Sequence, residues 1–290
     1  MIDWMKYRYL YFSISSIVII AGLFGLFQWG LNLGVDFKGG TIAEYKFSKS
    51  ISTESISGNI NKDIIDVNSI QETGKNTYLF RLPPLSSDQR QKVKEILLGI
   101  DDKAEELRFE TVGPSIGPEL VKKTIFALLI SAGGILFWVA YQFKSIKFGV
   151  SAVLAMFHDS LVLIGLFSLL GHFFGAEVDF LFVTALLTIL SFSVHDTIVV
   201  YDRIRETQKK TGEDLVDITN HALTQTMVRS LNNSMTIVFM LIALVLLGGT
   251  TIKWFAVALL IGTVSGTYSS PFVAVPILIT WDQLEKKYKK

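Results

Sequence analysis

Val178 to Tyr201 reads VDFLFVTALLTILSFSVHDTIVVY, an apolar run that is long enough to cross a lipid bilayer as one helix. A hydrocarbon core of about 30 Å needs about 20 consecutive, mainly apolar residues in helical conformation. His195 and Asp196 interrupt this run toward its C-terminal end. Ionisable side chains are costly inside a membrane, so their presence in a span marks a candidate functional site.

Further runs of the same kind lie on both sides of this one. Together they predict six transmembrane helices, over residues 9–30, 124–141, 148–170, 178–201, 228–248 and 254–280. The chain is 50% hydrophobic with a mean hydropathy of +0.44, which is more apolar than an ordinary soluble domain. The sequence therefore predicts an α-helical membrane protein with six transmembrane helices.

The distribution of positive charge predicts the orientation of these spans. Lys and Arg accumulate in short cytoplasmic loops, and here they gather before the first span, in 142–147, in 202–227 and in 281–290. Both termini are therefore predicted to be cytoplasmic. The predicted domains are the N-terminal tail with the first span (1–30), an extracytoplasmic domain (31–123), the five remaining spans (124–280) and a cytoplasmic tail (281–290).

The extracytoplasmic segment has the pattern of a small α+β domain. Residues 42–47 alternate between two faces as in a strand, and Ser86 and Gln89 have the spacing of a helix capping box. Strands are predicted near 42–47, 67–73, 77–82 and 106–112, helices near 52–62 and 86–100, and a hairpin turn at 74–76. The order β-α-β-β-α-β is the ferredoxin-like plan.

Asp196 and Arg229 are predicted to lie at similar depth in the bilayer. Asp196 follows Asp179, at the outer end of the fourth span, by 17 residues, and Arg229 precedes Gly248, at the outer end of the fifth, by 19. An ion pair between them would relieve the desolvation of both charges. A movable Arg229 would also switch Asp196 between a proton-holding and a proton-releasing state, which is a proton relay. A fixed ion pair that only holds the helices in register is the alternative.

Other polar residues in the spans are candidates for a supporting network. They are His158 and Asp159 in the third span, His195 beside Asp196, and Asn232 and Asn233 after Arg229. For His158 and Asp159, hydrogen bonding between helices is the alternative to proton handling. No metal site is predicted, because the chain has 4 histidines without ligand spacing and no cysteine. The sequence also shows neither a nucleophile paired with a general base nor a phosphate-binding loop, so an enzyme is not predicted.

Small residues in the sixth span indicate close helix packing. Gly262 and Gly266 are four residues apart, and Pro271 and Pro276 follow them. Small residues at this spacing let helix backbones approach each other, and proline permits a kink. A gate beside Asp196 and Arg229 is the alternative function of this segment.

Several stretches carry motifs that go beyond periodicity. Leu33 to Thr41 reads LGVDFKGGT, and its motif residues are Gly34, Asp36, Phe37, Gly39 and Gly40. Ser191 to Glu206 reads SFSVHDTIVVYDRIRE and includes Asp202 and Arg203. Thr224 to Ser234 reads TQTMVRSLNNS, and Gly266 to Pro271 reads GTYSSP. With the His158-Asp159 pair, these stretches resemble the SecF family over almost the whole chain.

The resemblance implies a partner and an energy source. It implies a complex with SecD that resembles a twelve-span transporter of the resistance-nodulation-division type, in the bacterial inner membrane. It also implies assistance to preproteins that cross the Sec channel (SecY/SecE/SecG), driven by the proton gradient without a cofactor. Asp196 and Arg229 match the family's proton-pathway residues, whereas His195 stands where the family usually has Asn. Membrane lipid is a further expected partner, and nucleic acid is not.

Two other functions remain open at this point. One is a half-size, proton-coupled exporter of small molecules, although an extracytoplasmic domain of this size is small for such an exporter. The other is a scaffold of the Sec channel that moves no protons. Proton flux in proteoliposomes with and without SecD distinguishes a scaffold from a transporter.

Overall fold

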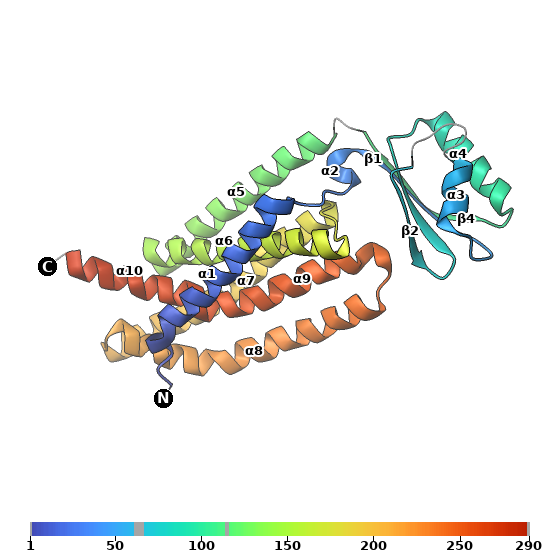
Figure 1. Cartoon of the computed structure of the whole chain (residues 1–290). Coiled ribbons are helices and arrows are strands. Elements are labelled where there is room, and N and C mark those ends of the chain that lie inside the picture. Colours follow the sequence, from blue (N-terminus) through green and yellow to red (C-terminus); the bar gives the residue numbers. More distant parts are fainter. Residues whose placement is uncertain (1, 61–66, 114–115, 289–290) are drawn as a thin grey trace. The chain divides into compact units, whose positions relative to one another are not determined.

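The computed structural model describes residues 2–60, 67–113 and 116–288, which form two compact units. Met1–Asn32 and Phe126–Lys290 belong to a helical unit, and Leu33–Ile125 belong to a smaller α+β unit. Figure 1 labels the elements. Their bounds are η1 (Trp4–Tyr7), α1 (Arg8–Trp29), α2 (Val35–Lys38), β1 (Gly40–Lys46), α3 (Thr53–Ile60), β2 (Ser69–Gly74), β3 (Thr77–Leu82), α4 (Ser87–Ile100), β4 (Glu105–Val112), α5 (Ile116–Phe143), α6 (Ile146–Phe174), α7 (Phe180–Thr211), α8 (Leu215–Leu247), α9 (Thr250–Ser269), η2 (Ser270–Ala274) and α10 (Val275–Tyr288).

The helical unit confirms the prediction of six membrane spans. Six helices are long and apolar enough to cross a bilayer: Trp4–Trp29, Gly117–Phe143, Ile146–Phe174, Phe180–Lys210, Leu215–Leu247 and Thr251–Tyr288. Several extend beyond the predicted apolar runs, because a helix does not end where its hydrophobic residues end. Most of the predicted cytoplasmic stretch 202–227 is helical, since α7 continues to Thr211 and α8 begins at Leu215. Of the predicted tail, residues 289–290 lie outside the described residues.

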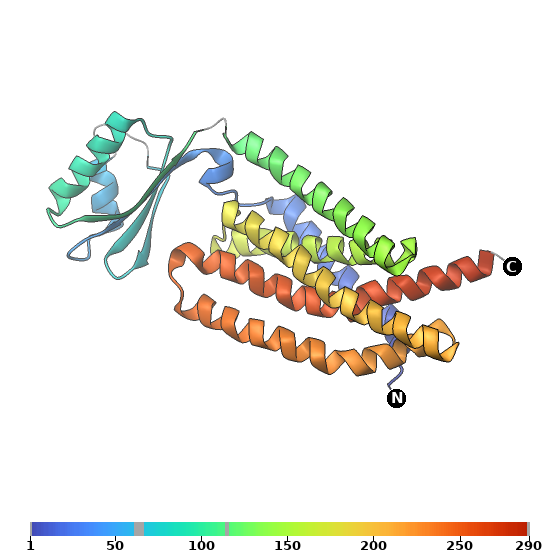
Figure 2. The same ribbon diagram turned by 180° about the vertical axis from the view of Figure 1, so that it is seen from behind.

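The centre of the bundle is formed by α6, α7 and the last span. Figures 1 and 2 show α8 running beside α9 at one edge, with α1 packed on α6. The approach of α1 to α6 is close because both helices have glycine at the crossing. A Cβ atom added to Gly165 would lie 2.5 Å from the Cα atom of Gly22. The two glycines therefore permit a backbone contact that larger residues would prevent.

The last span changes helix type in its middle. α9 passes into the π-helical segment η2, which contains Pro271, and then into α10. Proline has no backbone N–H to donate, and insertion of a π turn is one way in which a helix accommodates this loss. Ser270 and Pro271 are buried there, so the irregular segment lies within the bundle.

The smaller unit is a four-stranded antiparallel sheet in the order β2-β3-β1-β4, which confirms the predicted β-α-β-β-α-β plan. Its core lies between the sheet and the helices α3 and α4, with Tyr45, Phe80, Ile56 and Leu97 almost fully buried. The predicted capping box of Ser86 is present. The end of the first predicted helix, residues 61–62, lies outside the described residues.

Candidate functional site: two buried carboxylates in the helix bundle

Asp196 is buried where α7 faces α8. Only 4% of the surface of Asp196 is exposed. Its carboxylate Oδ2 accepts a hydrogen bond of 2.7 Å from the hydroxyl of Ser230 on α8. An O–H donor at this distance from a carboxylate is a strong, charge-assisted contact. The contact joins the two helices that were predicted to carry the relay.

Asp196 and Arg229 form no ion pair in this structure, although their similar predicted depth would allow one. Among the described residues, Asp196 is bonded to Ser230, whereas Arg229 is exposed. The prediction considered depth only, but successive residues of a helix differ by about 100° around its axis. Ser230 therefore takes the position facing α7, and the adjacent Arg229 lies to one side of it.

Arg229 lines a charged cleft of about 480 Å³. The cleft contains residues of α7 and α8 and Gln142 near the end of α5. Asp202 and Glu206 provide negative charge in its lining, and Arg203 donates hydrogen bonds to Glu206 and to Gln225. Arg229 thus shares this cleft with the carboxylates of Asp202 and Glu206, and its neighbour in the sequence, Ser230, is the donor to Asp196.

Asp159 is the most completely enclosed charged residue of the bundle. It has no exposed surface, and three serine hydroxyls donate hydrogen bonds of 2.6 Å to its carboxylate. Ser193 comes from α7, and Ser265 and Ser269 come from α9. A fourth contact of 3.1 Å joins Oδ1 to Nδ1 of His158. The carboxylate therefore ties α6 to α7 and α9.

The serines around Asp159 were absent from the predicted site. Ser265 and Ser269 stand four residues apart, which places them on one face of a helix, and this spacing is the signal in the sequence that points to them. Ser193 has no comparable signal, because its contact with Asp159 depends on how α7 packs. The same is true of Ser230 beside Asp196.

The remaining predicted residues fall into three groups. His195, Asn232 and Asn233 are exposed, and they are not among the hydrogen-bond partners described for Asp159 and Asp196. The motif residues Gly34, Asp36, Phe37, Gly39 and Gly40 belong to the α+β unit, where Gly39 and Gly40 have φ values of 77° and 145° that favour glycine. Gly262 and Gly266 face α7, where added Cβ atoms would lie 2.1 Å from Ile189 and 3.2 Å from Ser193.

Buried carboxylates with hydroxyl donors are suited to binding and releasing protons. Neither Asp159 nor Asp196 has a Lys or Arg among its described contacts. The described residues also contain no group of three His, Cys, Asp or Glu that would hold a metal ion. The site thus combines two buried carboxyl groups with hydroxyl donors from α7, α8 and α9.

Comparison with known proteins assigns the family. The family model for the C-terminal part of the protein export membrane proteins SecD/SecF matches residues 92–284, and the SecD/SecF GG motif model matches residues 24–51. Protein translocase subunit SecF of Thermobaculum terrenum is 43% identical, and the alignment covers 97% of this chain and 94% of that protein. The chain belongs to the SecF family. The SecF subunit of Anaerolinea thermophila is 40% identical over 98% of this chain and 96% of that protein.

Longer relatives combine a SecF-like part with other sequence. The SecDF subunit of Bacillus subtilis is 31% identical over 98% of the SecF-family chain, which spans only 39% of that protein. The crystal structure of SecDF from Thermus thermophilus, described as a translocon-associated membrane protein, matches with a TM-score of 0.84 and 31% identity. That match covers 97% of this chain and 39% of the SecDF chain. The fold is therefore shared with about two fifths of SecDF.

Proposed function

We propose that this SecF-family chain is one half of a SecD/SecF complex that uses the proton gradient to assist protein export through the Sec channel. Asp196 is the proton-binding residue, and Arg229 is the cation that controls its charge. The observation that carries this proposal is the buried Asp196–Ser230 contact, because it lies one residue from Arg229. Family membership supports the translocase role, and the family's six-span plan supports a multi-pass membrane location.

The exposed polar residues of α7 and α8 support a protein partner on this face. His195, Arg229, Asn232 and Asn233 are all exposed in the isolated chain, although the sequence predicts them within or near spans. Such groups are costly against lipid and usually face protein or a water-filled path. SecD is the partner proposed for this face, since SecDF relatives carry both names in one chain.

The proposed relay alternates the contacts of Asp196. With Ser230 as its donor and Arg229 in the cleft, Asp196 can accept a proton at little electrostatic cost. Movement of Arg229 toward Asp196 then stabilises the carboxylate and releases the proton. Because Ser230 and Arg229 are adjacent on α8, a change in the side-chain conformation of Arg229 together with a rotation of that helix exchanges one contact for the other.

The α+β unit is proposed to handle the emerging preprotein outside the cytoplasm. Both termini are proposed to lie in the cytoplasm and the spans in the bacterial inner membrane, on the basis of the distribution of Lys and Arg. The unit has its own hydrophobic core, so it can act as a separate body that responds to changes in the bundle.

Proton flux in proteoliposomes that contain this chain and SecD tests the relay. We expect flux with the wild type and its loss in Asp196→Asn. Glu213→Gln is a matched control, because Glu213 is an exposed carboxylate in the loop before α8. A scaffold that moves no protons would show no flux with any variant. Equal flux for the wild type and Asp196→Asn would exclude Asp196 from the pathway.

A further inference from the structure

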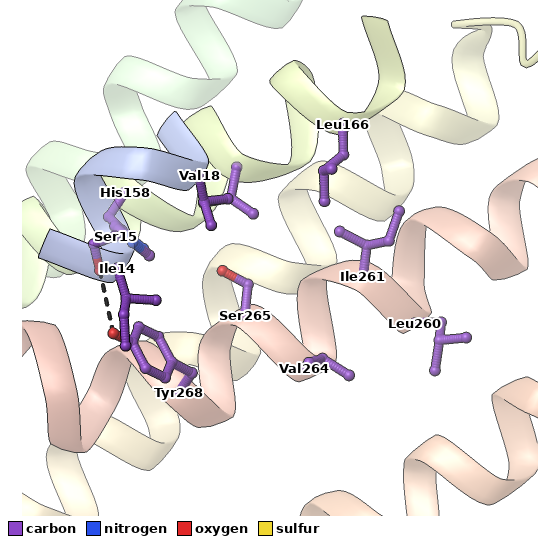
Figure 3. Close-up of a pocket in the computed structure, with 11 residues that line it drawn as sticks. Ile14, Ser15, Val18, His158, Leu166, Leu260, Ile261, Val264, Ser265 and Tyr268 are labelled. Carbon is purple, nitrogen blue, oxygen red and sulfur yellow. Dashed lines mark hydrogen bonds between the residues drawn. The ribbon is translucent and has the colours of Figure 1, made fainter. Parts of the chain in front are cut away.

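A crevice lies between α1, α6 and α9, on the side of Asp159 that the proposed relay does not use. Its volume is about 410 Å³, within the usual range of ligand sites. Ser15, His158, Ser265 and Tyr268 contribute to the lining, and the remaining lining residues are all aliphatic. Figure 3 shows Ser15, His158 and Tyr268 close together, with Leu166, Leu260 and Ile261 farther along the crevice.

His158 stands between this crevice and Asp159. Its Nδ1 atom contacts the Asp159 carboxylate, and its side chain contributes to the crevice wall. Nε2, on the other side of the imidazole ring, is buried and has no hydrogen-bond partner among the described residues. The residue as a whole is only 7% exposed. A buried polar atom without a partner costs about 1–3 kcal/mol, so its retention requires an explanation.

The charges around Asp159 show what the imidazole can do. The polar groups that face the pair are Ser193 of α7, Ser265 and Ser269 of α9, and the Tyr268 ring, whose centroid lies 6.4 Å from that of His158. The facing residue of α1, Ser15, is neutral, and Asp196 of α7 is bonded to α8. His158 is therefore the basic group that contacts Asp159.

Because an uncompensated charge is unfavourable inside the membrane, the stable states of the His158–Asp159 pair hold one proton. An ionised Asp159 beside a neutral imidazole would be a buried, uncompensated charge, which is strongly unfavourable. An imidazolium with a carboxylate and a neutral imidazole with a carboxylic acid both have zero net charge. Each of these states holds one titratable proton, and each leaves Nε2 facing away from Asp159.

We propose that His158 and Asp159 form a second, occluded proton-binding site, and that the crevice between α1, α6 and α9 controls its exchange with water. When the crevice widens, a water molecule reaches Nε2. The proton-free pair, a neutral imidazole with its proton on Nδ1 beside the Asp159 carboxylate, carries the uncompensated charge and takes up a proton when water arrives. A hydronium ion gives its proton to Nε2 and leaves as water, and the proton on Nδ1 passes to Asp159 Oδ1, so that the pair becomes neutral and the ring becomes its other tautomer. Release reverses both transfers. This site does not depend on Asp196 and Arg229 being the relay.

Infrared titration of the full chain in lipid vesicles tests the site directly. A protonated carboxyl group has a C=O stretching band that a carboxylate lacks. We expect one such band to disappear in Asp159→Asn and to remain in Asp196→Asn. His158→Gln, which keeps a polar side chain but removes the imidazole, should shift the frequency of this band. Ser265→Ala removes one donor from the same carboxylate and should shift the band's frequency.

Deuterium exchange of the same band tests the crevice. Val264 is 53% exposed and lines the crevice on α9. We expect Val264→Trp to slow the exchange several-fold and Val264→Ala to accelerate it. Leu154→Trp is the matched control, because Leu154 is 45% exposed on α6 but does not line the crevice.

The outcomes separate this proposal from the relay. The proton site would be overturned if Asp159→Asn lost no carboxyl band. It would also be overturned if neither His158→Gln nor Ser265→Ala changed that band. Equal exchange rates in the Val264 and Leu154 variants would overturn the role of the crevice. Neither result bears on proton flux through Asp196, which is measured separately.

Discussion

The carboxylate of Asp196 accepts a hydrogen bond of 2.7 Å from the hydroxyl of Ser230, and this contact joins α7 to α8 inside the bundle. The buried carboxyl group of Asp196 is thus held by the residue next to Arg229 in the sequence, and not by Arg229 itself. The relay proposed here depends on the exchange of this hydroxyl for the Arg229 guanidinium.

Replacement of Ser230 by alanine should disturb that exchange. A hydrogen bond to a charged group contributes about 1.5–3 kcal/mol, which corresponds to a shift of about tenfold or more in the balance between the two contacts. We expect Ser230→Ala to reduce gradient-dependent export several-fold and Ser230→Thr, which keeps the hydroxyl, to retain most of it. Thr188→Ala is the control, because the Thr188 hydroxyl bonds only to the backbone of its own helix. Equal export by Ser230→Ala and the control would argue against the exchange.

The contact of Gly262 with Ile189 predicts a specific loss of stability. A Cβ atom at Gly262 would lie 2.1 Å from Ile189 Cδ1, and the rest of that side chain is also too close. We expect Gly262→Ala to lower the thermal stability of the purified chain in detergent by several degrees, because α9 must move away from α7. Gly134→Ala, at a position with no neighbouring atom within 4 Å, should have little effect.

A double variant checks the reason for that loss. Ile189→Ala makes room for the new methyl group, so the combined Gly262→Ala and Ile189→Ala chain should be more stable than the sum of the single effects predicts. Additive losses would mean that the two positions do not meet across the α7–α9 interface.

Asp101 gives the α+β unit a pH-dependent contact. Its carboxylate accepts hydrogen bonds of 2.7 Å from the Ser48 hydroxyl and 2.6 Å from the Ser48 backbone N–H, and these bonds lower the pKa of Asp101. A carboxyl group whose pKa is lowered by folding stabilises the fold above its ordinary pKa, and this contribution is lost as the pH falls below about 4.

Asp101→Asn should therefore make the unit more sensitive to protease at neutral pH. We expect trypsin to cleave it several degrees below the temperature needed for the wild type at pH near 7. With pepsin at a pH of about 3, the two chains should differ less, because the stabilisation from a carboxyl group whose pKa is lowered by folding decreases as the pH falls below its ordinary pKa. The same difference at both pH values would show that the effect does not come from the charge of Asp101.

The architecture was largely predictable from local patterns. Apolar runs predict the six spans, and alternation, a capping box at Ser86 and a turn at 74–76 predict the order of strands and helices. The turn is confirmed by Asn76, which has a φ of 59°, as expected for the tight connection between β2 and β3. These features depend on neighbouring residues in the sequence, which is why one sequence is sufficient to predict them.

The contacts of the candidate site were less predictable, because they depend on the rotation of each helix about its own axis. Similar depth in the bilayer suggested that Arg229 would lie beside Asp196. The rotation of α8 about its own axis places Ser230 beside Asp196 instead. Similarly, Asp159 was predicted only as a supporting residue, yet it accepts hydrogen bonds from Ser193, Ser265 and Ser269. Small polar residues are frequent in spans, so their type alone does not reveal which of them meet.

Export of a secreted protein into membrane vesicles, with and without a proton gradient, tests the central claim most directly. The vesicles would contain SecD and either the wild-type chain, Asp196→Asn or Arg229→Met. We expect both variants to assemble with SecD and to keep the gradient-independent part of export but to lose the gradient-dependent part. Full dependence on the gradient in both variants would contradict this expectation, and Asp196 and Arg229 would then have a structural role only.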